Sequence, residues 1–506
     1  MSSTTPRTTG QGTLTRAGRR AIGAGALLAA AVLAGTTAAA TTATAAPARP
    51  GSPWAATTRV STGTAGAQPD GASWANGLSA DGRYAVLGSD ATNLVPGDTN
   101  GKTDVFVRDL LTGRTERVSL TSTGAQADGA SYDGSISANG RYVVFTSTAA
   151  LVPGDTNGTE DIYLRDRFTG RTERLTAGDP NSAQADRNSF MPSISWDGRY
   201  VAFASTRTDL VPGGSPSLAN VYVTDRRTGD TRLITVGADG TPADRPSTAP
   251  VISGDGSTVG FTSKATNLLP ATEGRPSGFA AGSVESGDSG DSVDDHVPGR
   301  PARAAIDSPS TGARAEILKP RHYPFYVHRL ATGKTSGASI DQSGELLGSS
   351  AGSLSPDGRY AVFSLPLPNS PDSTGWQRHF EIFVRDLRQG TVRQLPPVLP
   401  GTATTGSSYG GVMAAGNRWV YFVSDAENLV PGDTNQVDDI FRHDLWTGRT
   451  ERLSVSSDGA QTTGSSSGPI VDALGTTVLF TSDDGTLVPG DTNTASDAFT
   501  RRVSLF

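Results

Sequence analysis

The sequence predicts an all-β protein, a seven-bladed β-propeller of four-stranded antiparallel blades whose last blade is closed by an N-terminal strand. Three observations predict it. A phrase of turn and strand residues recurs at a nearly constant spacing. The composition, with 61 Gly, 31 Pro and only 3 Met in 506 residues, favours strands and turns over helices. The last repeat lacks one strand, which a segment near the N-terminus supplies.

The recurring phrase is Ser-x-Asp-Gly-Arg-Tyr-x-x-Phe, and its tight turn marks each copy. The turn falls at positions 82, 140, 198, 256, 358, 417 and 475. The steps between these positions are 58, 58, 58, 102, 59 and 58 residues, so one copy carries an insertion of about 44 residues. A fixed period of this kind indicates structural units that pack against their neighbours.

Each copy contains four short β-like runs. In the first copy they lie near Gly77–Ser79, Tyr84–Leu87, Val105–Val107 and Thr115–Ser119, with Asp-Gly and Thr-Gly turns between them. Glycine readily adopts the positive φ that tight hairpin turns need, and Asn417, which replaces it in the sixth copy, is the next most tolerant residue. One four-stranded blade cannot cover its own faces, so the copies must stack.

The two ends of the repeat array predict how the ring closes. The last copy runs through Asp497–Phe499 without a final Thr-Gly turn and fourth strand. Thr58–Ser61 matches Glu116–Ser119 at a step of 58 residues. We therefore expect the last blade to combine three C-terminal strands with one N-terminal strand, which leaves no unpaired sheet edge. The propeller would span residues 55–506.

The first 48 residues differ from the rest. Arg19 and Arg20 precede an apolar run over residues 21–35, and Ala46–Ala48 fits a small-x-small cleavage site, so residues 1–48 are predicted to be a signal peptide. The arginine pair leaves the twin-arginine and general secretory routes both open. A membrane anchor is the alternative, but the run falls short of the roughly 20 residues that span a bilayer.

Charge and cysteine content exclude several classes of protein. The formal net charge of −7 argues against nonspecific binding to nucleic acid or anionic membrane. The sequence contains no cysteine, which excludes disulfides, thiol catalysis and a lipid-modified cysteine. We expect a monomer, secreted or at the cell-envelope exterior, with no stable membrane insertion after signal cleavage.

The repeat also resembles a known family. The phrase Ser-x-Asp-Gly-Arg-Tyr-Val-x-Phe followed by Asp161–Asp166 resembles the propeller repeat of the TolB type, which is related in shape to WD repeats. The resemblance covers about residues 55–506 and implies the propeller fold. The small α/β domain that precedes the TolB propeller has no counterpart here, so the resemblance implies a stand-alone propeller, and the partners of TolB are not carried over.

The loop Leu-Val-Pro-Gly-Asp-Thr-Asn is the most distinctive element, and a further aspartate precedes the next strand. Carboxylate and amide oxygens at this spacing are the hard ligands that Ca²⁺ prefers. The competing interpretation is that the aspartates accept hydrogen bonds from nearby backbone amides. The calcium candidates, in four copies, are Asp98, Asn100, Asp104, Asp155, Asn157, Asp161, Asp433, Asn435, Asp439, Asp491, Asn493 and Asp497.

Two surface regions are candidates for binding. The Pro-Gly-Asp loops and the links at Asp128 and Asp186 should line one rim, which would be acidic and would attract cations or a basic partner unless it is only a solvated face. In the fourth copy the loop sequence is lost after Leu268–Pro270, and residues 271–320 are too polar to bury themselves, which predicts a disordered insertion. It is either a partner-binding segment or lid, or a tolerated surface loop.

The sequence offers little support for catalysis. The histidines are predicted to occupy different repeat positions, so no metal triad or Ser-His-Asp set can be placed: His296, His322, His328, His379 and His443. The acids are repeat elements, whereas a glycosidase pair ought to break the repeat. Six tryptophans offer rings for stacking on sugars, although Trp419 takes a strand position typical of a core residue.

The leading hypothesis is an exported, non-catalytic binding or scaffolding module for a protein, a glycan or a small ligand. The alternative is an extracellular hydrolase or lyase with its site in the propeller funnel, which needs non-repeating polar residues on the axis. The first strands should line the funnel, and they carry ordinary packing residues that favour the scaffold: Leu78, Ile136, Ile194, Ile252 and Leu354.

Overall fold

The computed structural model describes residues 56–178, 187–215, 218–270, 323–349, 352–366, 379–395, 399, 402 and 405–504. The chain divides into two units, Met1–Pro47 and Ala48–Phe506. The predicted signal peptide and the predicted insertion lie outside the described residues. Within the described part, no helix has the length and apolar character needed to cross a membrane.

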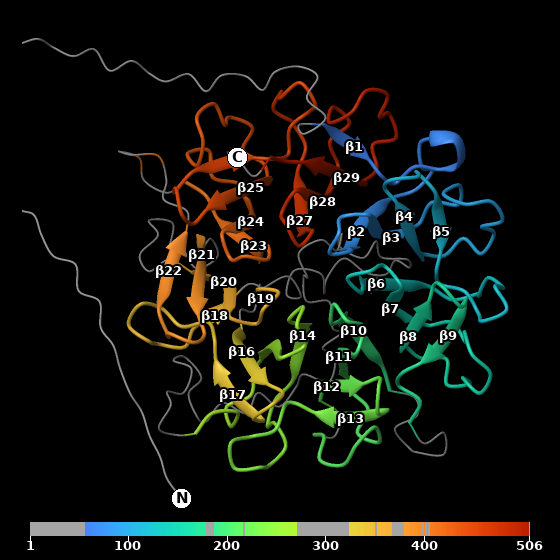
Figure 1. Cartoon of the computed structure of the whole chain (residues 1–506), viewed down its shortest axis with the longest axis vertical. Helices are drawn as coiled ribbons and strands as arrows, with labels where there is room; N and C mark the ends of the chain where they lie inside the picture. The colour runs from blue at the N-terminus through green and yellow to red at the C-terminus, as the bar shows by residue number, and fades with distance from the viewer. Residues whose placement is uncertain are drawn as a thin grey trace, which may run out of the picture. The chain divides into compact units, whose positions relative to one another are not determined.

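The second unit is a seven-bladed β-propeller, as predicted (Figure 1). Each blade is an antiparallel sheet of four strands in chain order, numbered here from the first complete blade. Blade 1 contains β2 (Ser73–Leu78), β3 (Tyr84–Ser89), β4 (Asp104–Asp109) and β5 (Thr115–Arg117); blade 2 contains β6 (Ser131–Ile136), β7 (Tyr142–Ser147), β8 (Asp161–Asp166) and β9 (Arg171–Arg174). Blade 3 contains β10 (Ser189–Ile194), β11 (Tyr200–Ser205), β12 (Asn220–Asp225) and β13 (Asp230–Leu233).

The remaining blades keep this plan with small departures. Blade 4 contains β14 (Ser247–Ile252), β15 (Thr258–Ser263), β16 (Tyr323–Arg329) and β17 (Lys334–Gly337), with β18 (Gly348–Ser349) also paired to β16. Blade 5 contains β19 (Gly352–Leu354), β20 (Tyr360–Pro366), β21 (Phe380–Asp386) and β22 (Val392–Leu395). Blade 6 contains β23 (Ser408–Met413), β24 (Trp419–Ser424), β25 (Asp439–Asp444) and β26 (Thr450–Arg452).

Blade 7 is built from both ends of the propeller. Its sheet order is β1 (Thr57–Arg59), β29 (Asp497–Arg502), β28 (Thr477–Ser482) and β27 (Ser466–Val471). Thr58 pairs with Thr500 in an antiparallel register. The predicted closure is therefore confirmed, and the strand begins one residue earlier than the sequence indicated. A short 3₁₀ turn, Thr64–Gly66, follows β1.

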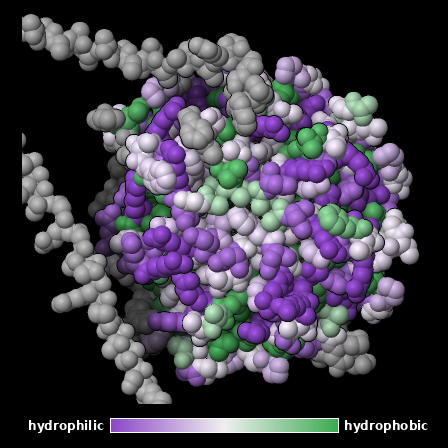
Figure 2. All heavy atoms as spheres, viewed as in Figure 1, coloured by the Kyte–Doolittle hydropathy of each residue, from purple (hydrophilic) through white to green (hydrophobic). Residues whose placement is uncertain are grey.

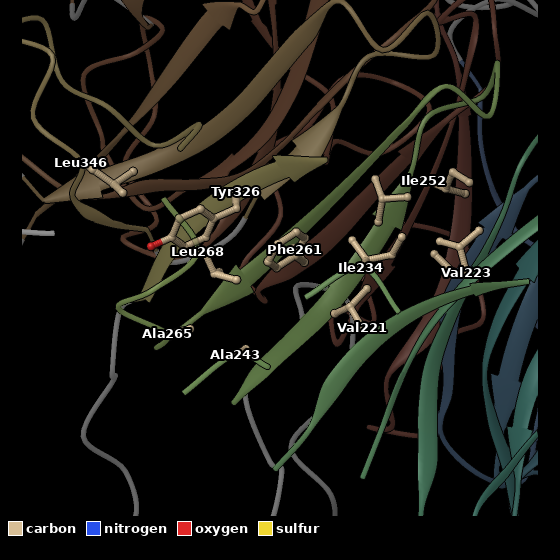
Figure 3. Close-up of a cluster of buried hydrophobic side chains, with 12 residues drawn as sticks. Val221, Val223, Ile234, Ala243, Ile252, Phe261, Ala265, Leu268, Tyr326 and Leu346 are labelled. Carbon is tan, nitrogen blue, oxygen red and sulfur yellow. The ribbon is translucent and has the colours of Figure 1, made fainter. Parts of the chain in front are cut away.

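The cores lie between neighbouring blades. The second and third strands are apolar along both faces because each blade is covered on one face by the preceding blade and on the other by the following blade. In blade 2 the rings of Phe145 and Tyr163 stack with centroids 6.1 Å apart. Figure 3 shows the core between blades 3 and 4, where Val221, Phe261 and Tyr326 belong to one buried cluster.

Backbone hydrogen bonds join the blades near the axis. The Ala80 amide donates to the Ala138 carbonyl at 3.1 Å, and the same contact recurs from turn to turn. Between blades 5 and 6 the donor position is Pro356, which has no N–H. There the Asn417 side-chain amide donates to Asp357 at 2.8 Å. The other contacts of this ring are Ala138 to Trp196, Trp196 to Gly254, Asp255 to Pro356, Ala415 to Ala473 and Ala473 to Ala80.

The antiparallel order defines two faces of the propeller. The turns after the first and third strands lie at the same end of every blade, in blade 1 at Ala80–Arg83 and Leu110–Arg114; we call this the hairpin face. The loop after the second strand and the link to the next blade lie at the other end, in blade 1 at Asp90–Thr103 and Val118–Ala130; we call this the loop face.

Deleting residues 56–61 should strongly destabilise the propeller. The deletion leaves β29 as an unpaired edge and removes Val60, which is buried in the core. It also removes Arg59, the partner of two buried carboxylates, and such a loss alone costs about 3–5 kcal/mol. Thermal unfolding should show a much lower Tm, whereas Thr58→Ala, at an exposed position of the same strand, should leave it nearly unchanged. Equal melting curves for the deletion and the wild type would contradict closure through β1.

Candidate binding sites

The predicted calcium ligands of blade 1 form a buried ion-pair network at the loop face. Arg117 Nη1 lies 3.0 Å from Asp98 Oδ1 and 3.1 Å from Asp104 Oδ2. Ser119 donates a hydrogen bond to Asp104, and the Asn100 side-chain amide donates to the same carboxylate at 3.1 Å. A guanidinium group therefore lies between the two carboxylates.

The same network occurs in three further blades. In blade 2, Arg174 Nη1 lies 2.7 Å from Asp155 and 3.4 Å from Asp161. The equivalent groups are Arg452 with Asp433, Asp439 and Asn435 in blade 6, and Arg59 with Asp491, Asp497 and Asn493 in blade 7. In blade 2, Asn157 likewise donates to Asp161 at 3.0 Å.

The sequence analysis did not identify this arginine as a partner of the aspartates. A comparison of the repeat copies could have identified it. In the blades with both aspartates, the last residue of the fourth strand is arginine. In blade 3 the aspartate positions hold Gly214 and Asn220, and Leu233 replaces the arginine. In blade 5, Glu381 precedes the third strand's core residues and Gln394 replaces the arginine. Blade 3 thus lacks the acids and the arginine together, as expected of an ion pair, whereas blade 5 keeps an acid, Glu381, which accepts a hydrogen bond from Gln394.

The burial of these carboxylates differs from the exposed acidic rim that the sequence predicted. Asp98, Asp155 and Asp433 are at most 9% exposed. Burial raises the pKa of Asp433 to about 6, against the opposing charge of Arg452. Burial likewise raises the pKa of Asp497 to about 6. The positive charge needed to hold these carboxylates ionised is therefore already supplied by arginine.

This arrangement is not a preformed calcium site. The cation would have to displace the guanidinium from between the two carboxylates. Among the residues that the structure describes, no group of three or more histidine or acidic side chains is placed to hold a metal ion. Calcium binding at the loop face remains a prediction that only a measurement can decide.

A second ion-pair network lies at the hairpin face. In blade 2, Arg141 Nε and Nη2 donate to the two oxygens of Asp166 at 3.0 and 2.7 Å. The guanidinium carbon lies 4.8 Å from the centre of the Tyr142 ring. Hydrogen bonding from Arg141 lowers the pKa of Asp166 to about 2. Equivalent pairs are Arg83–Asp109, Arg199–Asp225, Arg359–Asp386 and Arg418–Asp444.

Four consecutive blades each carry one large exposed apolar side chain in a turn of the hairpin face. Leu111, Phe168 and Trp446 occupy the same position in the turn after the third strand, and each is at least 68% exposed. Leu474, in the first turn of blade 7, is 66% exposed. These four residues, which we call the apolar arc, belong to the consecutive blades 6, 7, 1 and 2. Blades 3, 4 and 5 carry Arg227, Ala331 and Arg388 at the shared turn position.

Arginine side chains hold the two aromatic members of the arc. The Arg141 guanidinium lies 5.5 Å from the Phe168 ring centre, and that of Arg418 lies 4.9 Å from the Trp446 ring centre. The face seen in Figure 2 is mostly hydrophilic, with hydrophobic residues in separate areas. Exposed apolar groups held in place by arginine are characteristic of interaction surfaces.

The first strands of neighbouring blades contact one another around the axis. Leu78, Ile136, Ile194 and Ile252 are buried and Leu354 is half-buried, so these residues pack in the cores. Several first strands contain a β-bulge, and Asp133, Met191 and Ala249 there have positive φ of 57°, 55° and 50°. Of these three bulge residues only Asp133 is ionisable, so the bulges supply no pair of ionisable groups.

The described histidines do not converge either. His328 and His443 occupy the same position of the third strand in blades 4 and 6, which corrects the prediction that the histidines take different repeat positions. The insertion in the fourth copy obscured this equivalence. In both residues Nδ1 lies 2.9 Å from a threonine hydroxyl of the adjoining strand. His379 precedes β21, and His296 and His322 lie outside the described residues.

A cavity of about 480 Å³ lies between blades 3 and 4. Blade 3 contributes Arg232 and Ile234 near its fourth strand, and Gly237 in the following link. Blade 4 contributes His328 and Leu330 at the end of its third strand. Ile234 and Leu268, which also line the cavity, belong to the core cluster of Figure 3.

No protein-family model and no curated protein matches the chain. Among solved structures, the chain is similar to an oligogalacturonate lyase from Vibrio parahaemolyticus, with 11% identity, coverage of 90% of this chain and 96% of that chain, and a TM-score of 0.49. An oligogalacturonate lyase in complex with manganese is 12% identical, with coverage of 91% of this chain and 95% of that chain and a TM-score of 0.49. A protein assigned as TolB from Agrobacterium tumefaciens is 16% identical, with coverage of 64% of this chain and 79% of that chain and a TM-score of 0.34. At these values we draw no argument about activity, substrate or metal.

Calcium should leave the Tm of the wild type unchanged relative to a chelator, because arginine already neutralises the loop-face carboxylates. Differential scanning fluorimetry in the two buffers measures this. Arg452→Met should lower the Tm by an amount that corresponds to about 3–5 kcal/mol, because it leaves Asp433 and Asp439 buried without a counter-charge. A rise in Tm with calcium that Asp98→Ala and Asp433→Ala abolish would instead establish the calcium site.

The two networks predict opposite pH effects on stability. A raised folded pKa means that the contribution of Asp433 and Asp497 is full below their ordinary value of 3.8 and is lost as the pH rises through about 6. A lowered pKa means that the contribution of Asp166 is full above 3.8 and is lost as the pH falls through about 2. Denaturant unfolding should therefore show stability rising from pH 7 toward about 4 and falling below it. Asp433→Asn should reduce the rise in stability between pH 7 and about 4, and Asp166→Asn should reduce the fall in stability below about 4. A pH profile of stability that neither substitution changes would contradict these assignments.

Proposed function

We propose that the chain is an exported, non-catalytic binding module that docks another protein through the apolar arc of its hairpin face. The observation that carries the proposal is the placement of Leu111, Phe168, Trp446 and Leu474 on four consecutive blades. Protein interfaces are enriched in aromatic residues and arginine, and a few such residues supply most of the binding energy. The aromatic members of the arc, Phe168 and Trp446, lie against the guanidinium groups of Arg141 and Arg418, so both residue types occur at this face.

The arc is also a departure from the repeat. The positions equivalent to Leu111 in blades 3 and 5 hold arginine, which a solvated turn tolerates. The apolar side chains stabilise no core of the propeller, since they lie in the solvent. Trp446 is 73% exposed, and a partner that covers its ring would remove this apolar surface from water.

The alternative of a hydrolase or lyase in the funnel has less support. The conspicuous carboxylates are bound to arginine in repeated networks, as in Asp104 with Arg117 and Asp166 with Arg141. The first-strand positions of the described chain that depart from the repeat supply few ionisable groups. Export by the predicted signal peptide and a monomeric state belong to the same proposal.

A variant of the arc tests the proposal. Leu111→Ser, Phe168→Ser, Trp446→Ser and Leu474→Ser are combined, and Arg227→Ser with Arg388→Ser serves as the matched control at the equivalent turn positions. Immobilised wild-type and control proteins should retain the same protein from the extracellular fraction of the producing cells, and the arc variant should lose it. Each hot-spot residue contributes about 2 kcal/mol or more, so affinity for the purified partner should fall at least about 100-fold.

Two results would contradict the proposal. One is a partner that binds the arc variant as tightly as the wild type while both show the same melting curve. The other is turnover of a peptide or polysaccharide substrate by the purified propeller, which would favour the enzyme instead. The equal melting curves are needed because they show that the substitutions change the surface without unfolding the ring.

A further inference from the structure

The cavity between blades 3 and 4 lies where the two preceding blade junctions hold an ion pair. Between blades 1 and 2, Arg167 Nε donates to Glu116 Oε1 at 2.7 Å, and between blades 2 and 3, Arg226 lies 3.4 Å from Glu173. The strand registers place Arg232 of blade 3 at the position of these glutamates. Leu330 of blade 4 takes the position of the arginines. The acid of that pair is therefore replaced by a base and the base by an apolar residue. The junction between blades 5 and 6 has the same exchange, but there Arg393 Nη1 donates to the Leu445 carbonyl of the next blade at 2.9 Å, whereas Arg232 lines the cavity.

A second contact is also replaced at this junction. Arg165 of blade 2 donates through Nη1 to the Thr121 carbonyl of the preceding link at 2.9 Å, and Arg501 of blade 7 lies 3.3 Å from the Ser456 carbonyl in the same way. In blade 4 this position is His328, whose Nδ1 lies 2.9 Å from Thr335 in its own blade. The shorter imidazole does not cross to the link, and Gly237 of that link lines the cavity.

The walls that result are basic and apolar. Arg232, His328 and Lys334 line the cavity, and none of the described residues that line it is acidic. Within the described chain, Arg232 forms no ion pair, although its charge helps to lower the pKa of Asp225 in the adjoining strand. Leu233, Leu268 and Leu330 supply an apolar wall. Burial lowers the pKa of His328 to about 4, so the imidazole is neutral near pH 7 and acts as a hydrogen-bonding group.

We infer that this cavity binds a small organic anion, a carboxylate with an apolar chain. The carboxylate takes the place of the glutamate that the preceding two junctions supply, and pairs with Arg232. The apolar chain lies against the leucines between the blades. A volume of about 480 Å³ is within the range of small-molecule sites, roughly 300–1,000 Å³. The site is distinct from the apolar arc and does not depend on it.

Octanoate is the probe that tests the inference, with 1-octanol and octylammonium as matched neutral and cationic compounds. Isothermal titration calorimetry measures affinity, and thermal unfolding measures stabilisation by the bound probe. Octanoate should bind up to about fivefold more tightly than 1-octanol, because an ion pair with the exposed Arg232 contributes up to about 1 kcal/mol. Octylammonium should not bind. Absence of octanoate binding, or equal binding of all three compounds, would overturn the inference.

Two substitutions locate the site. Arg232→Glu introduces the glutamate of the two preceding junctions and should abolish octanoate binding. His328→Arg fills the cavity with the side chain that blades 2, 5 and 7 carry at this position, so it should abolish binding with the fold intact. Lys102→Glu makes the same charge change on an exposed loop of blade 1 and should leave the affinity unchanged. Octanoate binding that survives both Arg232→Glu and His328→Arg would place the anion elsewhere and overturn the assignment.

Discussion

Closure of the ring through β1 is the interaction on which the rest of the structure depends. A four-stranded blade has two apolar faces, and both are covered only when every blade has two neighbours. Strand β1 completes blade 7 with more than backbone hydrogen bonds. Its Arg59 lies between Asp491 and Asp497, and Ser61 donates to Asp497 at 2.6 Å, as Arg117 and Ser119 do for Asp98 and Asp104 in blade 1. Ring closure and neutralisation of buried charge therefore depend on the same short segment.

Arginine forms ion pairs with aspartate at both the loop face and the hairpin face, but the burial of the aspartates differs between the two faces. At the loop face the carboxylates are buried in pairs, and burial raises their pKa despite the guanidinium, as for Asp433. At the hairpin face a two-point contact from Arg141 lowers the pKa of Asp166, because the ion pair is half-exposed and the carboxylate keeps other hydrogen bonds. The same pair of residue types thus stabilises the charged form at one face and tolerates it at the other.

The repeat made the fold predictable, and the closing strand with it, because both follow from spacing along one chain. The role of the acidic loops was harder to predict, since aspartate and asparagine at close spacing are typical both of calcium ligands and of ion-pair partners. The arginine that pairs with these acids, Arg117, lies on another strand, 13 residues beyond Asp104. Blade 3 shows that the arginine accompanies the acids, because Leu233 replaces the arginine where Gly214 and Asn220 replace the two aspartates. Such covariation between repeats carries information about contacts that spacing alone does not.

The candidate binding regions are departures from the repeat, and no single copy reveals them. A residue such as Arg232 is unremarkable in sequence, because arginine is common at the ends of these strands. It gains meaning when the register places it at the position where the two preceding junctions pair glutamate with arginine, with Leu330 of the next blade in place of that arginine. The apolar arc spans blades 6, 7, 1 and 2, and the cavity lies between blades 3 and 4, so the two regions occupy separate sectors of one ring. A rigid ring allows both to be occupied at once, since neither requires the blades to move.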